Sequence, residues 1–130
     1  MSRLEMSVGE KTLTFRYDVQ ALCEIEEDHG TLDALLDKMS GEDKPTQAQL
    51  YLIACTANAG ARFRAEAETV TPEWLRDHLS PGQLVKARVM AQAAIMVGMH
   101  RENALDDDGD VDETLEEIRK KKEQKTPAAG

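Results

Sequence analysis

The residue types that carry most enzyme and metal chemistry are few in this chain and stand far apart. His29, His78 and His100 share no ligand spacing with one another or with the two cysteines, whereas a zinc site needs three or four nitrogen, sulfur or oxygen donors from the protein. The chain has no glycine-rich phosphate loop, and its serines stand at expected helix caps and turns, without a nucleophile motif. The sequence therefore predicts no catalytic residue, no metal site and no cofactor.

The two cysteines, Cys23 and Cys55, fall in apolar helical surroundings and do not form a CxxC pair. A free cysteine in such surroundings behaves as a small apolar side chain. Two cysteines without a paired motif fit a reducing compartment, where disulfides are rare. We expect both thiols to be free and buried.

An acidic run at Asp106–Asp110 has some likeness to a calcium-binding loop. Such a loop needs oxygen ligands at fixed positions and a glutamate at the twelfth. If Gly109 takes the sixth position, Ala104 falls at the first and Leu115 at the twelfth, and neither offers a side-chain oxygen. The run is interpreted as a solvated loop.

Length and charge narrow the classes of function. The chain has 130 residues and a formal net charge of −9, and only 4% of its residues are aromatic. This length predicts one domain with a modest core. The acidic balance argues against binding to nucleic acid or to an anionic membrane, because both need clustered lysine and arginine. With no apolar run long enough to span a bilayer and no signal-peptide pattern, we expect a cytosolic protein.

The N-terminal stretch over residues 3–17 predicts a β-hairpin. Apolar residues alternate with polar ones on both sides of Gly9–Glu10, a pair that fits a tight turn. The alternating apolar residues are Leu4, Met6 and Val8, then Leu13, Phe15 and Tyr17.

The first helix is expected to follow directly, with Asp18 as its N-cap and Gly30 closing it. Tyr17 and Leu22 stand at the positions of a hydrophobic staple. Drawn at 100° per residue, the inner face carries Val19, Leu22, Cys23 and Ile25.

Glu26 projects within that apolar arc. A buried unpaired carboxylate would be costly, so Glu26 either lies at the helix edge, pairs with an arginine, or faces a partner.

Four further helices are indicated by their capping signals. Thr31 caps a short second helix, and Thr46 with Gln49 forms a capping box for the third. That helix is apolar on nearly every side from Leu50 to Ala61, and it either breaks at Gly60 or continues through Arg64. The other starts are Thr71–Trp74 and Ser80–Gln83.

The fifth helix, from Pro81 to about Glu102, is apolar beyond one stripe. Such a helix is either central or leaves one face for a partner. The sequence thus predicts an α+β, mostly α fold, in which the N-terminal hairpin packs on a bundle of about five helices over residues 1–104.

A flexible tail that is acidic and then basic is expected over residues 105–130. Its apolar residues, Val111, Leu115 and Ile118, recur at helical spacing. Burying three such side chains cannot offset the entropy of ordering the segment, so a transient helix is expected, with this stripe as a docking edge.

The first helix carries a family resemblance. An aromatic residue, an aspartate, Ala–Leu, an Ile, Glu–Glu and a glycine follow one another at Tyr17, Asp18, Ala21–Leu22, Ile25–Glu27 and Gly30. This pattern resembles the N-terminal pattern of the tail assembly chaperones of long-tailed bacteriophages and gene-transfer agents. The order of elements from about Met6 to Asn103 is similar to that family, and the tail departs from it.

The resemblance implies a chaperone in the host cytoplasm that binds the phage tape measure protein and keeps it soluble. Candidate partner-binding residues are Glu26, Met90, Val97, Val111, Leu115 and Ile118. The sequence leaves open whether the chain forms a homo-oligomer. The alternative is a small acidic adaptor or a nucleic-acid mimic, with residues 106–117 as the mimic patch. An enzyme with a carboxylate pair is least favoured and would need a deep pocket around Glu26.

Overall fold

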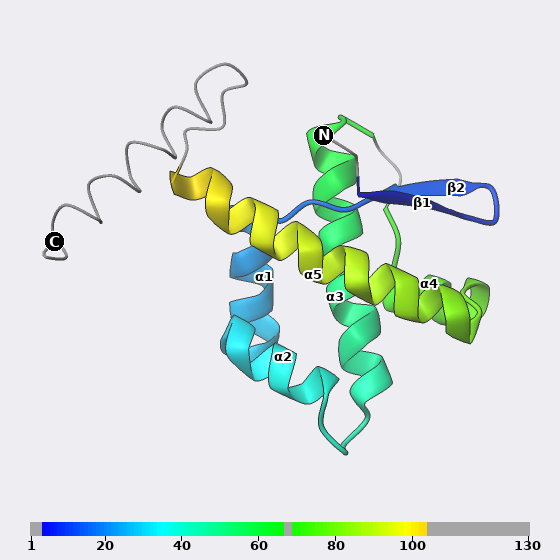
Figure 1. Ribbon diagram of the computed structural model, residues 1–130, viewed down its shortest axis with the longest axis horizontal. Coiled ribbons are helices and arrows are strands. Elements are labelled where there is room, and N and C mark those ends of the chain that lie inside the picture. The colour runs from blue at the N-terminus through cyan, green and yellow to red at the C-terminus, as the bar shows by residue number, and fades with distance from the viewer. Residues whose placement is uncertain (1–3, 67–68, 104–130) are drawn as a thin grey trace, which may run out of the picture. The chain divides into compact units, whose positions relative to one another are not determined.

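The computed structural model describes residues 4–66 and 69–103, and its elements follow one another as a hairpin and then helices (Figure 1). By contacts the chain divides into two compact units, residues 1–96 and 97–130, and the packing described below is that of the first. The predicted α+β, mostly α class is confirmed, whereas the predicted tail lies outside the described residues. The elements are β1 Glu5–Val8, β2 Lys11–Thr14, α1 Val19–His29, α2 Leu32–Met39, α3 Pro45–Phe63, α4 Pro72–His78 and α5 Pro81–Asn103.

The hairpin forms where the alternation predicts it. β1 and β2 pair antiparallel, and the last pair is Val8 with Lys11, which leaves Gly9–Glu10 as a two-residue loop. Gly9 has a φ of 60°, which glycine adopts without steric cost at the first position of a tight hairpin turn. Met6, Val8 and Leu13 are buried, so one face of the hairpin belongs to the core.

Both predicted caps of α1 are confirmed. The Asp18 carboxylate accepts a hydrogen bond from the Ala21 amide at 2.8 Å. Gly30, with a φ of 89°, donates its amide hydrogen to the Glu26 carbonyl oxygen at 3.0 Å. These bonds satisfy backbone groups that the helix itself cannot pair.

The predicted inner face of α1 is wrong in part. Ala21 and Ile25 are buried, but Val19 is 65% exposed and Cys23 is exposed. The prediction of two buried thiols therefore holds only for Cys55, which is buried. Sequence periodicity placed the polar residues outward, whereas Glu24 is turned toward α3 by its pairing with an arginine of that helix.

α3 is the central helix, as its apolar sequence predicts, and it runs through Gly60 to Phe63. The predicted capping box at its start is wrong. The helix begins at Pro45, Lys44 takes the cap position with a φ of 53°, and no side chain caps it. Gln49 instead donates from Nε2 to the Met39 carbonyl oxygen at 2.9 Å, and so ties α3 to the end of α2.

The hairpin meets α3 backbone to backbone. The Arg16 amide donates to the Thr56 carbonyl oxygen at 3.0 Å. At Gly60, an added Cβ would overlap the Thr14 carbonyl oxygen and lie 2.6 Å from its carbonyl carbon. Only glycine at position 60 permits the Thr14 backbone to come this close to α3. Nearby on the same helix, Thr56 is fully buried, and its hydroxyl donates to the Leu52 carbonyl oxygen at 2.9 Å.

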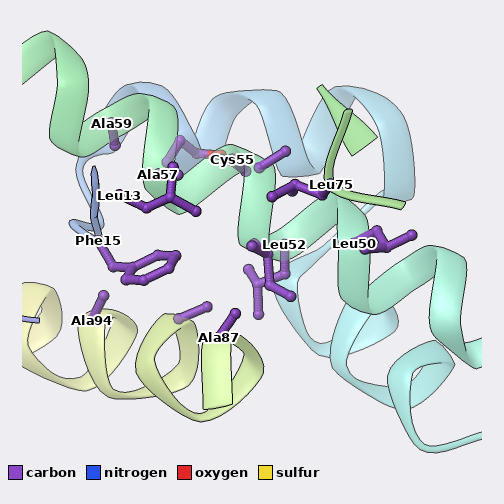
Figure 2. Close-up of a cluster of buried hydrophobic side chains, with 14 of the residues drawn as sticks. Leu13, Phe15, Leu50, Leu52, Cys55, Ala57, Ala59, Leu75, Ala87 and Ala94 are labelled. Carbon is purple, nitrogen blue, oxygen red and sulfur yellow. Dashed lines mark hydrogen bonds between the residues drawn. The ribbon is translucent and has the colours of Figure 1, made fainter. Parts of the chain in front are cut away.

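The starts of α4 and α5 match their sequence signals. Thr71 accepts from the Trp74 amide at 3.0 Å. Ser80 and Gln83 form a reciprocal capping box, with bonds of 2.9 and 3.2 Å. In Figure 2, Ala87 and Ala94 of α5 face Phe15 and the side chains of α3. Because alanine is small, the helix backbone can lie close to the core.

We predict that Gly60→Ala destabilises the protein by about 1–3 kcal/mol or more, because the added methyl group forces β2 away from α3. Unfolding in urea, followed by circular dichroism, measures the change in the free energy of unfolding.

Gly82→Ala is the matched control, since a Cβ at Gly82 would have nothing within 4 Å. It should be neutral or slightly stabilising, because alanine favours the helix. Equal stability of the two variants would contradict the close approach at Gly60.

Candidate interaction surface

Three of the residues predicted to bind a partner, Glu26, Met90 and Val97, are among the described residues, and they differ in exposure. Glu26 is exposed on α1, which agrees with a place at the helix edge. Met90 is partly buried and packs against the core cluster. Val97 is half-buried and belongs to the second unit. The tail stripe of Val111, Leu115 and Ile118 lies outside the described residues.

The structure instead exposes a different apolar face on α5. Val85, Val89 and Met96 are 50%, 53% and 65% exposed, and Gln92 between them is also exposed. Their spacing of four, three and four residues places them on one side of a helix. Ala87, Ala91 and Ala94 are buried and occupy the opposite side. We call the exposed set, Val85, Val89, Gln92 and Met96, the outward face of α5.

Sequence reasoning allowed a free face on α5 but placed Met90 and Val97 on it, because the helix is apolar almost all round and periodicity alone does not select a side. A signal was present in residue size. The alanines at 87, 91 and 94 recur at intervals of four and three, and the larger residues at 85, 89 and 96 at intervals of four and seven, so each set keeps to one side of the helix. The small residues mark the side that approaches the core closely, although the larger Ile95 is buried as well.

The outward face has basic flanks. Lys86 is exposed, Arg88 is half-buried, and residues 81–101 contain no aspartate or glutamate. The Nε of Arg88 is buried and has no hydrogen-bond partner within the described part of the chain. The face is therefore apolar and basic on a chain whose net charge is −9.

A polar network joins α1 to α3. Arg62 donates to both carboxylate oxygens of Asp18, at 3.1 and 3.3 Å, and its other terminal nitrogen lies 3.8 Å from Glu24. The Tyr51 hydroxyl lies 2.7 Å from Asp28 and 2.9 Å from the Glu24 carbonyl oxygen. These bonds fix the rotation of α1 and leave Val19 and Cys23 outside.

Cys55 lies at the centre of this network. Its thiol contacts the Ala21 carbonyl oxygen at 3.6 Å and Glu24 at 3.7 Å. Burial, reinforced by the nearby Glu24 carboxylate, raises the pKa of Cys55 to about 12. A nucleophilic cysteine needs a lowered pKa, so this thiol acts in packing and hydrogen bonding.

Two open depressions lie elsewhere on the first unit. One, of 520 Å³, lies between β2 and α3 and is lined by residues that include Thr12, Asn58 and Arg64. The other, of 460 Å³, is lined by residues that include Lys38, Tyr51 and Arg76.

Within residues 4–66 and 69–103, no group of three or more histidine, cysteine, aspartate or glutamate side chains could hold a metal ion. No helix in the same ranges is both long and apolar enough to cross a membrane.

Comparisons with known proteins add no relative to these observations, since no family model, no curated protein and no solved structure matches the chain.

We predict that the two thiols differ in reactivity. At pH 8, an aromatic disulfide reagent should modify Cys23 quickly, because that thiol is exposed, and should modify Cys55 only after unfolding. Spectrophotometric titration of native and urea-unfolded protein counts the thiols. Two fast thiols in the native protein would contradict the packing of α1 on α3.

Stability should also depend on alkaline pH. The pKa of Cys55 rises from 9.0 to about 12 on folding, and burial with a hydrogen bond to Asp28 raises the pKa of Tyr51 as well. The folded protein then holds protons that the unfolded chain releases, so stability is fully present below about pH 9 and declines above it.

Urea unfolding at pH 8 and pH 10.5 measures the decline, and Cys55→Ala should make it shallower. A decline that is just as steep in that variant would exclude the thiol as its source.

Proposed function

We propose that this protein is a tail assembly chaperone of a long-tailed phage or gene-transfer agent, and that it binds the tape measure protein in the host cytoplasm and keeps it soluble. The tape measure protein is a long helical chain, prone to aggregation until the tail tube surrounds it. The supporting sequence pattern is a strand followed by the capped helix and its closing glycine, with the matching residues at 17–30.

The observation that carries the proposal is the outward face of α5. Val85, Val89 and Met96 expose apolar side chains at helical spacing, and a protein that holds another helix needs such a surface. Isolated exposed apolar residues are ordinary, but several on one helical stripe indicate a contact surface.

Charge supports the same role. A holding chaperone works in many copies around an aggregation-prone chain, and a net charge of −9 keeps the copies from associating without order. Whether the copies also form a homo-oligomer is part of the proposal that light scattering can measure.

The test is co-expression with the long helical protein encoded immediately downstream, followed by affinity capture and light scattering. We expect a soluble complex with several copies of this chain for each long protein. Precipitation of the long protein as it precipitates alone, with this chain eluting as a monomer, would exclude the chaperone role and favour a small acidic adaptor.

The surface is tested by the double variant Val89→Glu with Met96→Glu, which should lose capture and keep its circular dichroism spectrum, because both side chains are more than half exposed. Val19→Glu on α1 is the matched control, since Val19 is as exposed as Met96, and it should keep capture. Equal loss in both variants would mean that general charge, rather than this face, decides binding.

Met90 gives a contrasting outcome. Because Met90 packs against the core cluster, Met90→Glu should lower the free energy of unfolding by about 2 kcal/mol or more. A stable Met90→Glu variant that loses capture would instead place Met90 in the contact surface, as the sequence predicted.

A further inference from the structure

The charged residues of α5 limit the kind of helix that can bind to its outward face. From Pro81 to Arg101 the sequence carries Lys86, Arg88 and Arg101 and no acid. On a helix at 100° per residue, Lys86 and Arg88 flank the stripe of Val85, Val89 and Met96 on opposite sides. A helix that packs on this stripe brings its own flanking residues toward these two cations.

Arg88 also bears on the charge of the partner. Its Nε is buried by the chain itself and has no hydrogen-bond partner among the described residues, so a docked helix cannot reach that atom. The residue as a whole is only half-buried, and a carboxylate of a docked helix can pair with the positive charge of its guanidinium.

The spacing of the face defines the partner's pattern. Intervals of four, three and four residues from Val85 to Met96 are those of the seam positions in a heptad repeat. Gln92 stands in the middle of the seam, where a polar residue favours one register. A partner helix therefore needs apolar residues at alternating intervals of three and four.

We propose that the outward face of α5 binds an acidic amphipathic helix of the partner, with apolar residues at intervals of three and four and carboxylates on both flanks. The inference rests on the proposed function, because it takes this face as the surface that receives the partner. It adds the charge and the spacing of the segment that is received.

Two designed helical peptides of about three heptads probe the full chain directly. Both carry leucine at the seam positions, and one has glutamate and the other lysine at the flanking positions. Fluorescence anisotropy of the labelled peptides should show the acidic peptide binding about tenfold or more tighter than the basic one, although the chain itself is acidic. The difference should shrink as salt rises.

Variants then locate the charge. Lys86→Glu should weaken binding of the acidic peptide about fivefold or more, because it reverses one flank of the seam. Arg76→Glu on α4 makes the same change in net charge at a residue that is also exposed, and it should leave binding unchanged. Val89→Glu with Met96→Glu should abolish binding of both peptides.

The inference is overturned if both peptides bind equally, or if Lys86→Glu and Arg76→Glu behave alike. It is also overturned if the full chain is a dimer that Val89→Glu with Met96→Glu converts to a monomer, since the face would then belong to a second copy. Capture of the long downstream protein that survives Lys86→Glu would leave the proposed function standing without this inference. Binding of the acidic peptide without capture of that protein would support the inference about the outward face and exclude the proposed function.

Discussion

The fold depends on the close approach of the hairpin to the central helix. Where β2 ends, the Arg16 amide bonds to the Thr56 carbonyl oxygen of α3, and Gly60 leaves the space that the Thr14 backbone occupies. A two-stranded hairpin is marginal alone, so this contact lets it form part of the core. It also brings Phe15 over the core, where Figure 2 shows it facing Ala94 of α5.

The interaction surface follows from the same packing. With the hairpin, α1, α2 and α4 against it, α3 is buried on nearly every side, and no apolar stripe of α3 remains for a partner. The buried side of α5 is made largely of alanines, with Ile95 beside them, while Val85, Val89 and Met96 lie outward. The basic residues beside them give this face a charge opposite to that of the chain as a whole, and the proposed preference for an acidic helix rests on that contrast.

Local signals in the sequence predicted the elements well. The caps at Asp18, Thr31, Thr71 and Ser80 act over three residues, and a single sequence carries them. The predictions that were wrong concern side chains whose positions depend on residues distant in the sequence. Val19 and Cys23 are outside because Arg62, which lies 44 residues after Asp18, draws Asp18 and Glu24 inward. Gln49 leaves its expected cap because the Met39 carbonyl oxygen lies within reach. The outward face of α5 was hidden for a similar reason, since only tertiary packing decides which apolar side is covered.

The central claim is that the outward face of α5 receives the partner helix. Oxidative footprinting of methionines tests it most directly, because Met96 is 65% exposed and Met39 only 5% exposed in the chain itself. In the free protein, Met96 should be oxidised quickly and Met39 slowly. In the complex with the long downstream protein, we predict that Met96 becomes as protected as Met39. Oxidation of Met96 at the same rate in the complex and in the free protein would contradict the account.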